Sequence, residues 1–314
     1  RPIISSQGKT VLIYNPHAGK LNGRGELALR GAAERLMRNG HEVVMVPTIG
    51  PGTAGTLARQ AAENRASMVV IAGGDGTINE ALPGLVHTSI PLAILPAGTA
   101  NVLANELGLP ARIDSAAARL ADCVPCRISV GRVTFPRPDT QPRYFLLMAG
   151  AGLDAQVVYR VSAPLTARLG KIAYWIAGFS LAGRKLDEFE VTVDGCSHAC
   201  SFALISKVRN YGGDLEIARD TSLFDDRFEV VLFAGSSSLR YIKYLGGVAL
   251  KRVAGLRGVT VLRAGQVKLA AENGQRIHLQ VDGENAGRLP ASVEIVPEAL
   301  TLLVPPAYAE RFAS

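Results

Sequence analysis

The part of the chain before Cys126 alternates short, mostly apolar runs with segments of helical periodicity, and this alternation restricts the fold more than any other sequence feature. Helices are predicted from about Glu26 to a stop at Asn39-Gly40, and over roughly Ala54 to Asn64. The pattern predicts an open α/β sheet that binds ligands at the carboxyl ends of its strands. The apolar runs have the length of strands buried on both faces of a parallel sheet: Val11–Asn15, Glu42–Val46, Met68–Ala72 and Leu92–Leu95.

After Cys126 the strand-like runs come in pairs, with Asp194-Gly195 as a hairpin turn, which predicts a mostly antiparallel β-sandwich. Helical insertions are expected near Ala155–Gly183 and Leu239–Ala254. Because 314 residues exceed what one core usually serves, two abutting domains with a cleft are expected. The predicted strands are Arg127–Thr134, Arg143–Met148, Glu188–Val193, Ala199–Ile205, Arg227–Phe233, Val259–Leu262, Val267–Ala271 and Ile277–Val281.

Charge and hydropathy raise the question of a membrane. Lys plus Arg number 34 against 27 acidic residues, a net charge of +7 that favours anionic partners. The uncharged run Ala81–Asn105 contains three prolines, so it is not a transmembrane helix, and with no signal-peptide pattern the expected location is the cytoplasm. From Ala155 through Leu186 there is no acidic residue, and basic residues flank Trp175 and other aromatics. A membrane-surface segment and a core helix with solvated basic ends both fit this stretch.

Other chemical motifs are weaker. Cys123 and Cys126 have metal-ligand spacing, but they lie far from Cys196 and Cys200, so we expect ordinary reduced thiols. The run from Gly150 to Ala155 fits a dinucleotide fingerprint, yet it lacks the acidic residue about 20 positions on that would hold the ribose. NAD binding there is therefore not expected.

The strongest motif is the turn Gly73-Gly74-Asp75-Gly76-Thr77, which follows the third apolar run directly and opens a helix. Glycines let phosphates approach backbone amides, and a helix N-terminus favours anions. A carboxylate among them suits Mg²⁺, and we expect Asp75→Asn to abolish activity with little change in melting. The competing structural interpretation is an Asp-Gly turn with a threonine cap. Two further loops at the same predicted edge, Asn15–Gly19 and Pro96–Asn101, predict one ligand held by three strand ends.

These loops, with a late Asp282-Gly283-Glu284, resemble the diacylglycerol-kinase catalytic-domain family, soluble bacterial lipid kinases related to sphingosine and ceramide kinases. The resemblance covers nearly the whole chain. It implies a phosphofructokinase-like α/β nucleotide domain over 8–126 with a C-terminal return at 296–314, and a β-sandwich lipid-substrate domain over 127–295. It also implies that ATP is bound by Asn15, Pro16, His17, Ala18, Gly19, Thr48, Gly73, Gly74, Asp75, Gly76, Thr77, Ile78, Asn79 and Thr99.

The resemblance further implies that Glu284 is the general base and that Asp154 lies near the lipid headgroup. From the residues alone, Asp282-Gly283 is simply a hairpin turn. A structural Mg²⁺ site is implied at Leu223, Asp226 and Phe228, although Arg227 stands where the family often has glycine. Val102 replaces an aspartate found in many diacylglycerol kinases, which favours a sphingoid or ceramide acceptor.

The resulting hypothesis is transfer of the ATP γ-phosphoryl group to a lipid hydroxyl, with Mg²⁺, by a cytoplasmic protein associated peripherally with an anionic membrane. The acceptor is diacylglycerol, a sphingoid base or ceramide, and no nucleic acid is expected as a partner. An NAD kinase and a non-catalytic nucleotide- or lipid-binding sensor are the alternatives. A homodimer is compatible with the sequence, which leaves the oligomeric state open.

Overall fold

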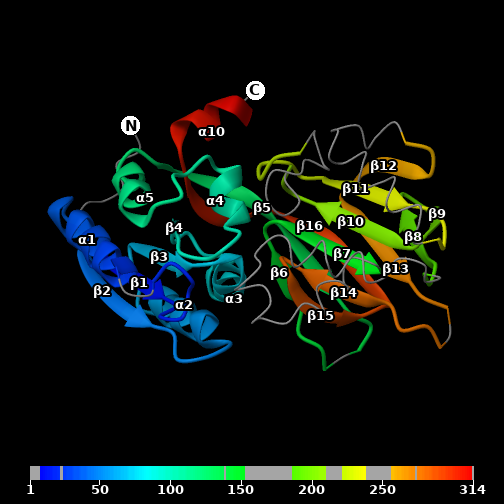
Figure 1. Ribbon diagram of the computed structural model, residues 1–314, viewed down its shortest axis with the longest axis horizontal. Helices are drawn as coiled ribbons and strands as arrows, with labels where there is room; N and C mark the ends of the chain where they lie inside the picture. Colours follow the sequence, from blue (N-terminus) through cyan, green and yellow to red (C-terminus); the bar gives the residue numbers. More distant parts are fainter. Residues whose placement is uncertain are drawn as a thin grey trace. The chain divides into compact units, whose positions relative to one another are not determined.

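Figure 1 shows the computed structural model, which describes residues 8–21, 24–137, 139–152, 186–209, 221–237, 256–272 and 274–312. The chain divides into two compact units. The α/β unit contains Arg1–Ser129 and Pro297–Ser314, and the sandwich unit contains Val130–Val296. The chain passes from one unit to the other within two long strands, β5 (Val124–Thr134) and β16 (Ala291–Val304).

The α/β unit is built on a parallel sheet of order β2-β1-β3-β4, and the last part of β16 lies parallel to β4. The side chains of β3 and β4 are all buried, because helices cover both faces of the sheet. The predicted open α/β sheet is therefore confirmed. Its strands are β1 (Lys9–Tyr14), β2 (Glu42–Pro47), β3 (Met68–Gly73) and β4 (Leu92–Pro96).

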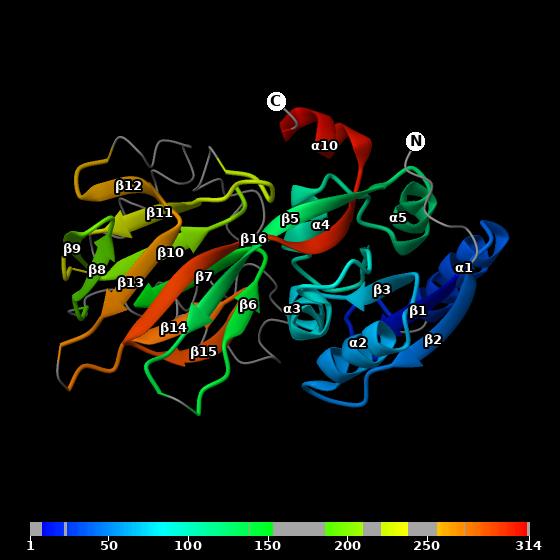
Figure 2. The ribbon, with the colours of Figure 1, turned by 180° about the vertical axis from the view of Figure 1, so that it is seen from behind.

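Helices α1 and α5 lie on one face of this sheet and α2 and α3 on the other, as Figures 1 and 2 show from opposite sides. Leu12, Val70 and Leu95 form one core with α1 and α5, and their strand neighbours of opposite parity point to the other face. The helices are α1 (Arg24–Arg38), α2 (Thr53–Glu63), α3 (Asp75–Leu85), α4 (Val102–Glu106), α5 (Ile113–Leu120) and α10 (Pro306–Phe312).

The sandwich unit has two sheets. One is six-stranded and antiparallel, in the order β12-β11-β10-β7-β14-β15, and the other contains β6, β5, β16, β13, β8 and β9. The strands new to this unit are β6 (Arg143–Phe145), β7 (Met148–Gly152), β8 (Phe189–Val193), β9 (Cys196–Cys200), β10 (Phe202–Ser206), β11 (Phe228–Phe233), β12 (Val259–Ala264), β13 (Gln266–Ala270), β14 (His278–Val281) and β15 (Glu284–Arg288).

The core of the sandwich unit comes from alternate residues of both sheets. Phe145 of one sheet stacks on Phe228 of the other, with ring centroids 5.6 Å apart. A Cβ at Gly131 would lie 2.1 Å from the Phe145 ring, so only glycine leaves room for this aromatic anchor. The predicted antiparallel sandwich is thus confirmed.

Two predicted strands need correction, because the chain changes sheet inside them. The segment predicted as Ala199–Ile205 is β9 in one sheet and β10 in the other, with buried Ser201 between them. The segment predicted as Arg143–Met148 is likewise divided into β6 and the start of β7. An apolar run does not record such a corner, since both sheets bury the same kinds of side chain.

The predicted helical insertions at Ala155–Gly183 and Leu239–Ala254 lie outside the described residues, as does Asp154. All four cysteines are free thiols, as the sequence predicts. Burial raises the pKa of Cys123 to about 11 and that of Cys200 to about 12, so these two thiols stay protonated and unreactive.

Candidate active site

Within the α/β unit, the three loops predicted to bind a nucleotide are held together by backbone hydrogen bonds. The N–H of Asn15 donates to the carbonyl of Ala72 at 3.1 Å, which ties the end of β1 to the end of β3. The N–H of Ala97 donates to the carbonyl of Gly73 at 3.0 Å, and that of Lys20 to the carbonyl of Ala97 at 3.0 Å. The parallel register of β1, β3 and β4 therefore brings all three loops to one edge of the sheet.

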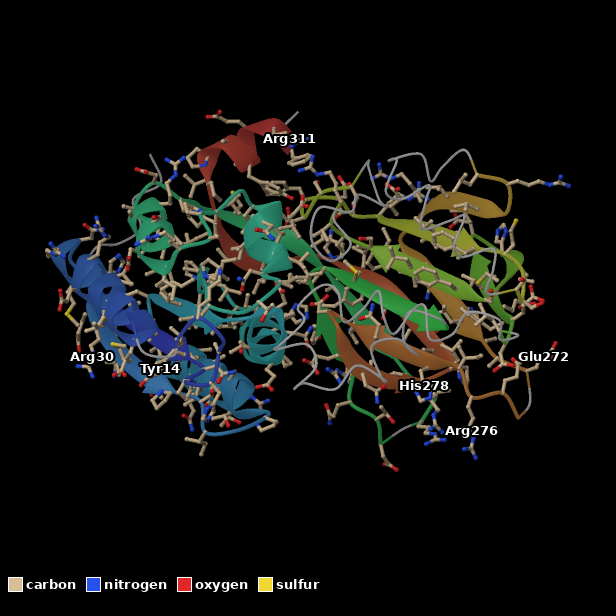
Figure 3. All side chains as sticks on the ribbon, in the orientation of Figure 1. Tyr14, Arg30, Glu272, Arg276, His278 and Arg311 are labelled. Atoms are coloured by element: carbon tan, nitrogen blue, oxygen red, sulfur yellow. The ribbon has the colours of Figure 1, made fainter. Side chains whose placement is uncertain are left out.

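The first loop, residues 15–19, is shaped by an Asx turn in which Asn15 Oδ1 accepts the N–H of His17 at 2.9 Å. His17 and Gly19 are exposed, and Ala18 is buried beneath them. The backbone carbonyl of Tyr14, a residue labelled in Figure 3 at the end of β1, accepts the N–H of buried Thr48 at 2.8 Å. These bonds present the backbone of the loop at the sheet edge.

The glycines of the second loop (residues 73–77) and the third loop (residues 96–101) have a packing role that the sequence does not reveal. A Cβ at Gly98 would lie 2.4 Å from the Cα of Gly74, and a Cβ at Gly73 would lie 2.7 Å from the Cβ of Thr77. These glycines are thus needed for contact between and within the loops, whether or not a phosphate is bound. The better evidence for an anion site is the N-terminus of α3, where the helix dipole favours an anion, while the N–H groups of Thr77 and Ile78 donate to the carbonyl of Gly74 at 3.1 and 3.2 Å.

Asp75 connects two of these loops. Its Oδ2 accepts the N–H of Val102 at 3.0 Å and its Oδ1 accepts the N–H of Leu103 at 3.1 Å, so the carboxylate caps the start of α4. Burial raises the pKa of Asp75, and the two amide hydrogen bonds oppose that shift. Each carboxylate oxygen keeps a second lone-pair direction, so a metal ion or a metal-bound water can still contact the group.

The cap on α4 corrects one sequence-based expectation. Asp75→Asn would place an amide NH₂ against one of two partly buried N–H groups, so the substitution should lower stability as well as activity. Asn101, the residue where a capping side chain is usual, is instead in the left-handed region with φ 46°. Its side chain exchanges two hydrogen bonds with the backbone of Gly98, at 2.9 and 2.7 Å. Sequence reasoning missed this role of Asn101.

In the sandwich unit, Glu284 is exposed and begins β15, directly after a two-residue turn. Asp282 and Gly283 have φ values of 48° and 84°, the left-handed pair that a tight β14–β15 hairpin requires. The side chain of Gln280 accepts the N–H of Gly283 at 2.8 Å. The predicted hairpin turn is confirmed, and it fixes the backbone from which Glu284 projects.

Asp282 does more than form the turn. Its Oδ1 accepts the N–H groups of Leu147 and Met148 at 2.9 and 3.0 Å, and its Oδ2 accepts that of Leu146 at 3.0 Å. These amides belong to the corner where the chain leaves β6 and enters β7. Asp282 therefore links the corner between β6 and β7 to the turn that precedes Glu284. The sequence carries no signal for this contact, since the partners are more than a hundred residues apart.

The predicted metal residues Leu223, Asp226 and Phe228 lie in and just after a loop that precedes β11. Lys207, which sequence reasoning also missed, is fully buried beside this loop. Burial lowers the pKa of Lys207 to about 8, while the charges of Asp225 and Asp226 oppose the shift. Its Nζ donates to the Leu223 carbonyl at 3.3 Å, so one predicted metal ligand already has a cationic partner.

The chain therefore combines an α/β unit, with glycine-rich loops at one edge of its parallel sheet, and an antiparallel β-sandwich unit. A model described as the diacylglycerol kinase catalytic domain matches residues 9–133. A model described as the YegS C-terminal NAD kinase beta sandwich-like domain matches residues 148–304. The chain belongs to the diacylglycerol kinase catalytic domain family and is an ATP-dependent lipid kinase.

Relatives extend along nearly the whole chain. A diacylglycerol kinase of Bacillus subtilis (strain 168) is 27% identical over 306 residues, covering 96% of this chain and 97% of its own. A diacylglycerol kinase of Mycobacterium tuberculosis (strain ATCC 25618 / H37Rv) is 29% identical over 303 residues, covering 95% and 96%. A crystal structure of a diacylglycerol kinase from Bacillus anthracis str. Sterne superposes with TM-score 0.76 at 22% identity, covering 95% and 98%, which shows a shared fold.

Among the helices of the described residues, none combines the length and the apolar character needed to cross a bilayer. Residues 155–185 of the acid-free stretch predicted to contact a membrane are not among the residues that the structure describes, so the role of this stretch stays a prediction.

Proposed function

We propose that this lipid kinase transfers the γ-phosphoryl group of ATP to the free hydroxyl of diacylglycerol. The observation that carries the proposal is the convergence of three loops at one edge of the parallel sheet, where α3 begins and its N-terminal dipole favours an anion. Membership of the family supplies the nucleotide and the lipid class of the acceptor. The relatives named as diacylglycerol kinases support diacylglycerol as the particular acceptor.

The nucleotide would be bound largely by backbone groups. Residues 15–19 and Thr48 line one side of the sheet edge, and residues 73–79 with Thr99 line the other. The Asx turn at Asn15 and the two hydrogen bonds between the Asn101 side chain and the Gly98 backbone hold these loops in place before ATP binds. A preformed cradle of this kind orients the phosphates without a loss of loop entropy at binding.

Mg²⁺ is the proposed metal cofactor, and Asp75 is the proposed protein group that holds it. When bound, Mg²⁺ neutralises charge on the phosphate oxygens. Because each Asp75 oxygen already accepts a backbone N–H, contact through a metal-bound water suits its geometry better than two direct bonds. Asp75 would then have two roles, since it also holds the second and third loops together.

Glu284 is the proposed general base. The attacking atom is the lipid hydroxyl oxygen, which forms a bond to the γ-phosphorus as the bond to the β,γ-bridging oxygen of ATP breaks. The carboxylate of Glu284 accepts the hydroxyl proton as this happens. Its support is its exposure at the start of β15 and the rigid turn that precedes it. Asp154, proposed to contact the lipid headgroup, rests on the family resemblance alone.

The identity of the residue at position 102 no longer favours a sphingoid acceptor. The Val102 side chain is buried, and its N–H is the donor to Asp75. A buried apolar side chain at the start of α4 reflects packing in the α/β unit, and it offers no polar group to a headgroup. Diacylglycerol is therefore the acceptor proposed here.

We also propose that the enzyme meets its lipid at the anionic cytoplasmic surface of a membrane, where ATP is available. The support is the net charge of +7 and the acid-free, basic and aromatic stretch after Ala155. Cosedimentation of the full chain with anionic vesicles at low and high salt tests this. Failure of the wild type to sediment at low salt would remove the proposal.

The proposed reaction is tested by labelled phosphate transfer from ATP to diacylglycerol, sphingosine and ceramide in mixed micelles, and to NAD in solution. We expect Mg²⁺-dependent labelling of diacylglycerol above the other acceptors. Labelling of NAD alone would identify an NAD kinase, and labelling of no acceptor with intact ATP binding would identify a sensor. Either result contradicts the proposal.

A further inference from the structure

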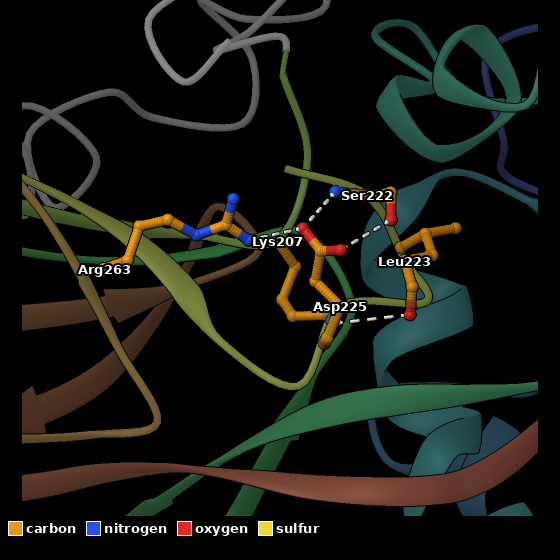
Figure 4. A network of polar contacts seen from close by, with 5 residues as sticks. All are labelled: Lys207, Ser222, Leu223, Asp225 and Arg263. Carbon is orange, nitrogen blue, oxygen red and sulfur yellow. Dashed lines mark hydrogen bonds and ion pairs between the residues drawn. The ribbon is translucent and has the colours of Figure 1, made fainter. Parts of the chain in front are cut away.

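The loop of residues 222–228 is organised around a buried ammonium group. Figure 4 shows Lys207 reaching into this loop, where its Nζ donates to the carbonyl oxygens of Leu223 at 3.3 Å and Asp225 at 2.6 Å. No part of Lys207 is exposed to solvent. Its own backbone N–H donates to the carbonyl of Leu147 at 2.8 Å, which fixes the origin of the side chain.

A second cation neutralises the carboxylate of the same loop. Arg263 of β12 forms an ion pair with Asp225 Oδ2 at 2.9 Å. The backbone N–H and the hydroxyl of Ser222 donate to the two Asp225 oxygens at 3.1 and 3.2 Å. Asp225 is therefore bound on both oxygens by groups of the protein itself.

These contacts conflict with a divalent cation at the predicted ligands Leu223, Asp226 and Phe228. Mg²⁺ bound to a carbonyl lies about 2.1 Å from the oxygen. The Lys207 ammonium lies 3.3 Å from the Leu223 oxygen, so an ion bound there would share that acceptor with a positive charge. Burial weakens the screening that would relieve such repulsion.

The side-chain ligands are also few. Asp226 is the one carboxylate in the predicted set, and the neighbouring carboxylate of Asp225 already forms an ion pair with Arg263. Over the described part of the chain, no three His, Cys, Asp or Glu side chains gather in a group that could hold a metal ion. Hard divalent ions depend on carboxylates to offset the loss of their hydration shell.

We infer that the Lys207 ammonium holds the 222–228 loop in place of the structural divalent cation predicted there. The geometry matches this role, because one tetrahedral ammonium with three N–H donors binds two carbonyls of the loop. The consequence is a loop whose conformation does not depend on metal. The inference does not depend on the lipid acceptor or on Mg²⁺ bound with ATP.

The test is the melting temperature of the full chain without ATP, in millimolar Mg²⁺ and in EDTA at equal ionic strength. We expect no Mg²⁺-dependent rise that originates in this loop, so wild type and Asp226→Asn should respond alike. Lys207→Gln should melt several degrees lower than wild type. The matched control Lys268→Gln, which removes an exposed lysine from β13 of the same unit, should melt with the wild type.

Two results would overturn the inference. One is a rise in wild-type melting temperature with Mg²⁺ that Asp226→Asn abolishes, since this would place a divalent ion in the loop. The other is a Lys207→Gln chain that melts with the Lys268→Gln control. If Lys207→Gln does not fold, the comparison of wild type with Asp226→Asn still decides the question. None of these readings uses turnover, so a failure here is distinct from a failure of the proposed reaction.

Discussion

The two Asp-Gly hairpin turns of the sandwich unit share a sequence and a backbone but differ in their surroundings. Asp194 and Gly195 join β8 to β9 with φ values of 49° and 80°, almost the values at Asp282 and Gly283. Asp194 is exposed, and its ion pair with Arg227 is 3.5 Å long and also exposed. Asp282 is nine-tenths buried and accepts three backbone N–H groups.

The difference shows that a turn motif predicts backbone shape without predicting what the turn supports. Both turns need residues that tolerate positive φ, and both satisfy that need with the same dipeptide. Only the second also anchors a distant corner of the fold. The residue after the first turn is Cys196, and the residue after the second turn is Glu284, the proposed general base.

The largest expected effect is a loss of activity in Glu284→Gln, which tests the role of the Glu284 side chain without disturbing the turn that precedes it. Glu284→Gln should lower kcat for lipid phosphorylation by about 10²–10⁴-fold, the usual contribution of a positioned base, while its melting temperature stays near that of wild type. Steady-state kinetics with diacylglycerol and ATP, paired with thermal melting, provides the measurement. The control is Glu190→Gln, an exposed glutamate on β8 that should keep full activity. A loss of only severalfold in Glu284→Gln would assign the proton to another group.

The next effect compares the two turns directly. Asp282→Ala should lower the free energy of unfolding by roughly 3–5 kcal/mol, because three buried N–H groups lose their acceptor. Asp194→Ala should cost about 1 kcal/mol, the penalty of a left-handed alanine. Urea denaturation of both variants measures the difference. Equal losses would mean that the Asp282 contacts add nothing beyond the turn itself.

A third prediction extends the comparison to Asp75, the partly buried carboxylate that caps α4 in the α/β unit. Asp75→Asn should lower the free energy of unfolding by about 1–3 kcal/mol, because one N–H at the start of α4 loses its acceptor. Activity should fall much further than this loss of folded protein explains. Phosphate transfer and urea denaturation should be measured on the same samples.

The control for Asp75 lies at the other end of α4. Tyr308→Phe removes a 3.1 Å hydrogen bond from Tyr308 Oη to Glu106 Oε1. It should lower stability by about 1 kcal/mol without reducing kcat. If Asp75→Asn behaves like Tyr308→Phe in both assays, Asp75 is a cap only and the proposed metal role is wrong.

The smallest expected effect is a pH dependence of folding stability that arises from His41, at the sheet edge away from the nucleotide loops. His41 precedes β2, lies next to Thr10 with 3.0 Å between Thr10 Oγ1 and His41 Nδ1, and has its pKa lowered from 6.5 by burial. The unfolded chain therefore takes up this proton at a higher pH than the folded chain, and stability falls as pH drops below about 6.5. His41→Gln should show a shallower loss between about pH 7.5 and 5.5 in urea denaturation. An unchanged slope would contradict the prediction.

Much of the α/β unit could be predicted from sequence, because each buried strand is a mostly apolar run and the first helix has a clear end signal at Asn39-Gly40. The predicted helix from about Glu26 to Asn39 is observed as Arg24–Arg38, and the predicted strand Met68–Ala72 as Met68–Gly73. Local pattern and tertiary burial agree in this unit, so the pattern is sufficient.

The sandwich unit was less predictable because its strands change partner without a change in composition. β15 and β16 were absent from the predicted strands, and β16 alternates in its first half but is continuously buried in its second. That change occurs near Glu298, whose φ of 46° marks an irregularity where the strand enters the other unit. A single period cannot describe a strand that serves two cores.

The candidate site also has a part that the sequence predicts and a part that it does not. Loop positions follow from strand ends, so residues 15–19, 73–79 and 96–101 could be placed together from sequence. The contacts of Asp75, Asp282 and Lys207 could not, because they join different elements across 27, 136 and 18 residues and no local pattern encodes them. Only the folded chain shows that these charged side chains bind backbone groups.

The close approach of Gly98 to Gly74 has a consequence for motion at the nucleotide edge. The N–H groups of Ala97 and Gly98 both donate to the single carbonyl of Gly73, at 3.0 and 3.2 Å. Because the two backbones are in direct contact and share these hydrogen bonds, one loop cannot open while the other stays in place. Their amide hydrogens should therefore exchange with deuterium in one shared opening event, and a nucleotide that protects either loop should slow exchange in both.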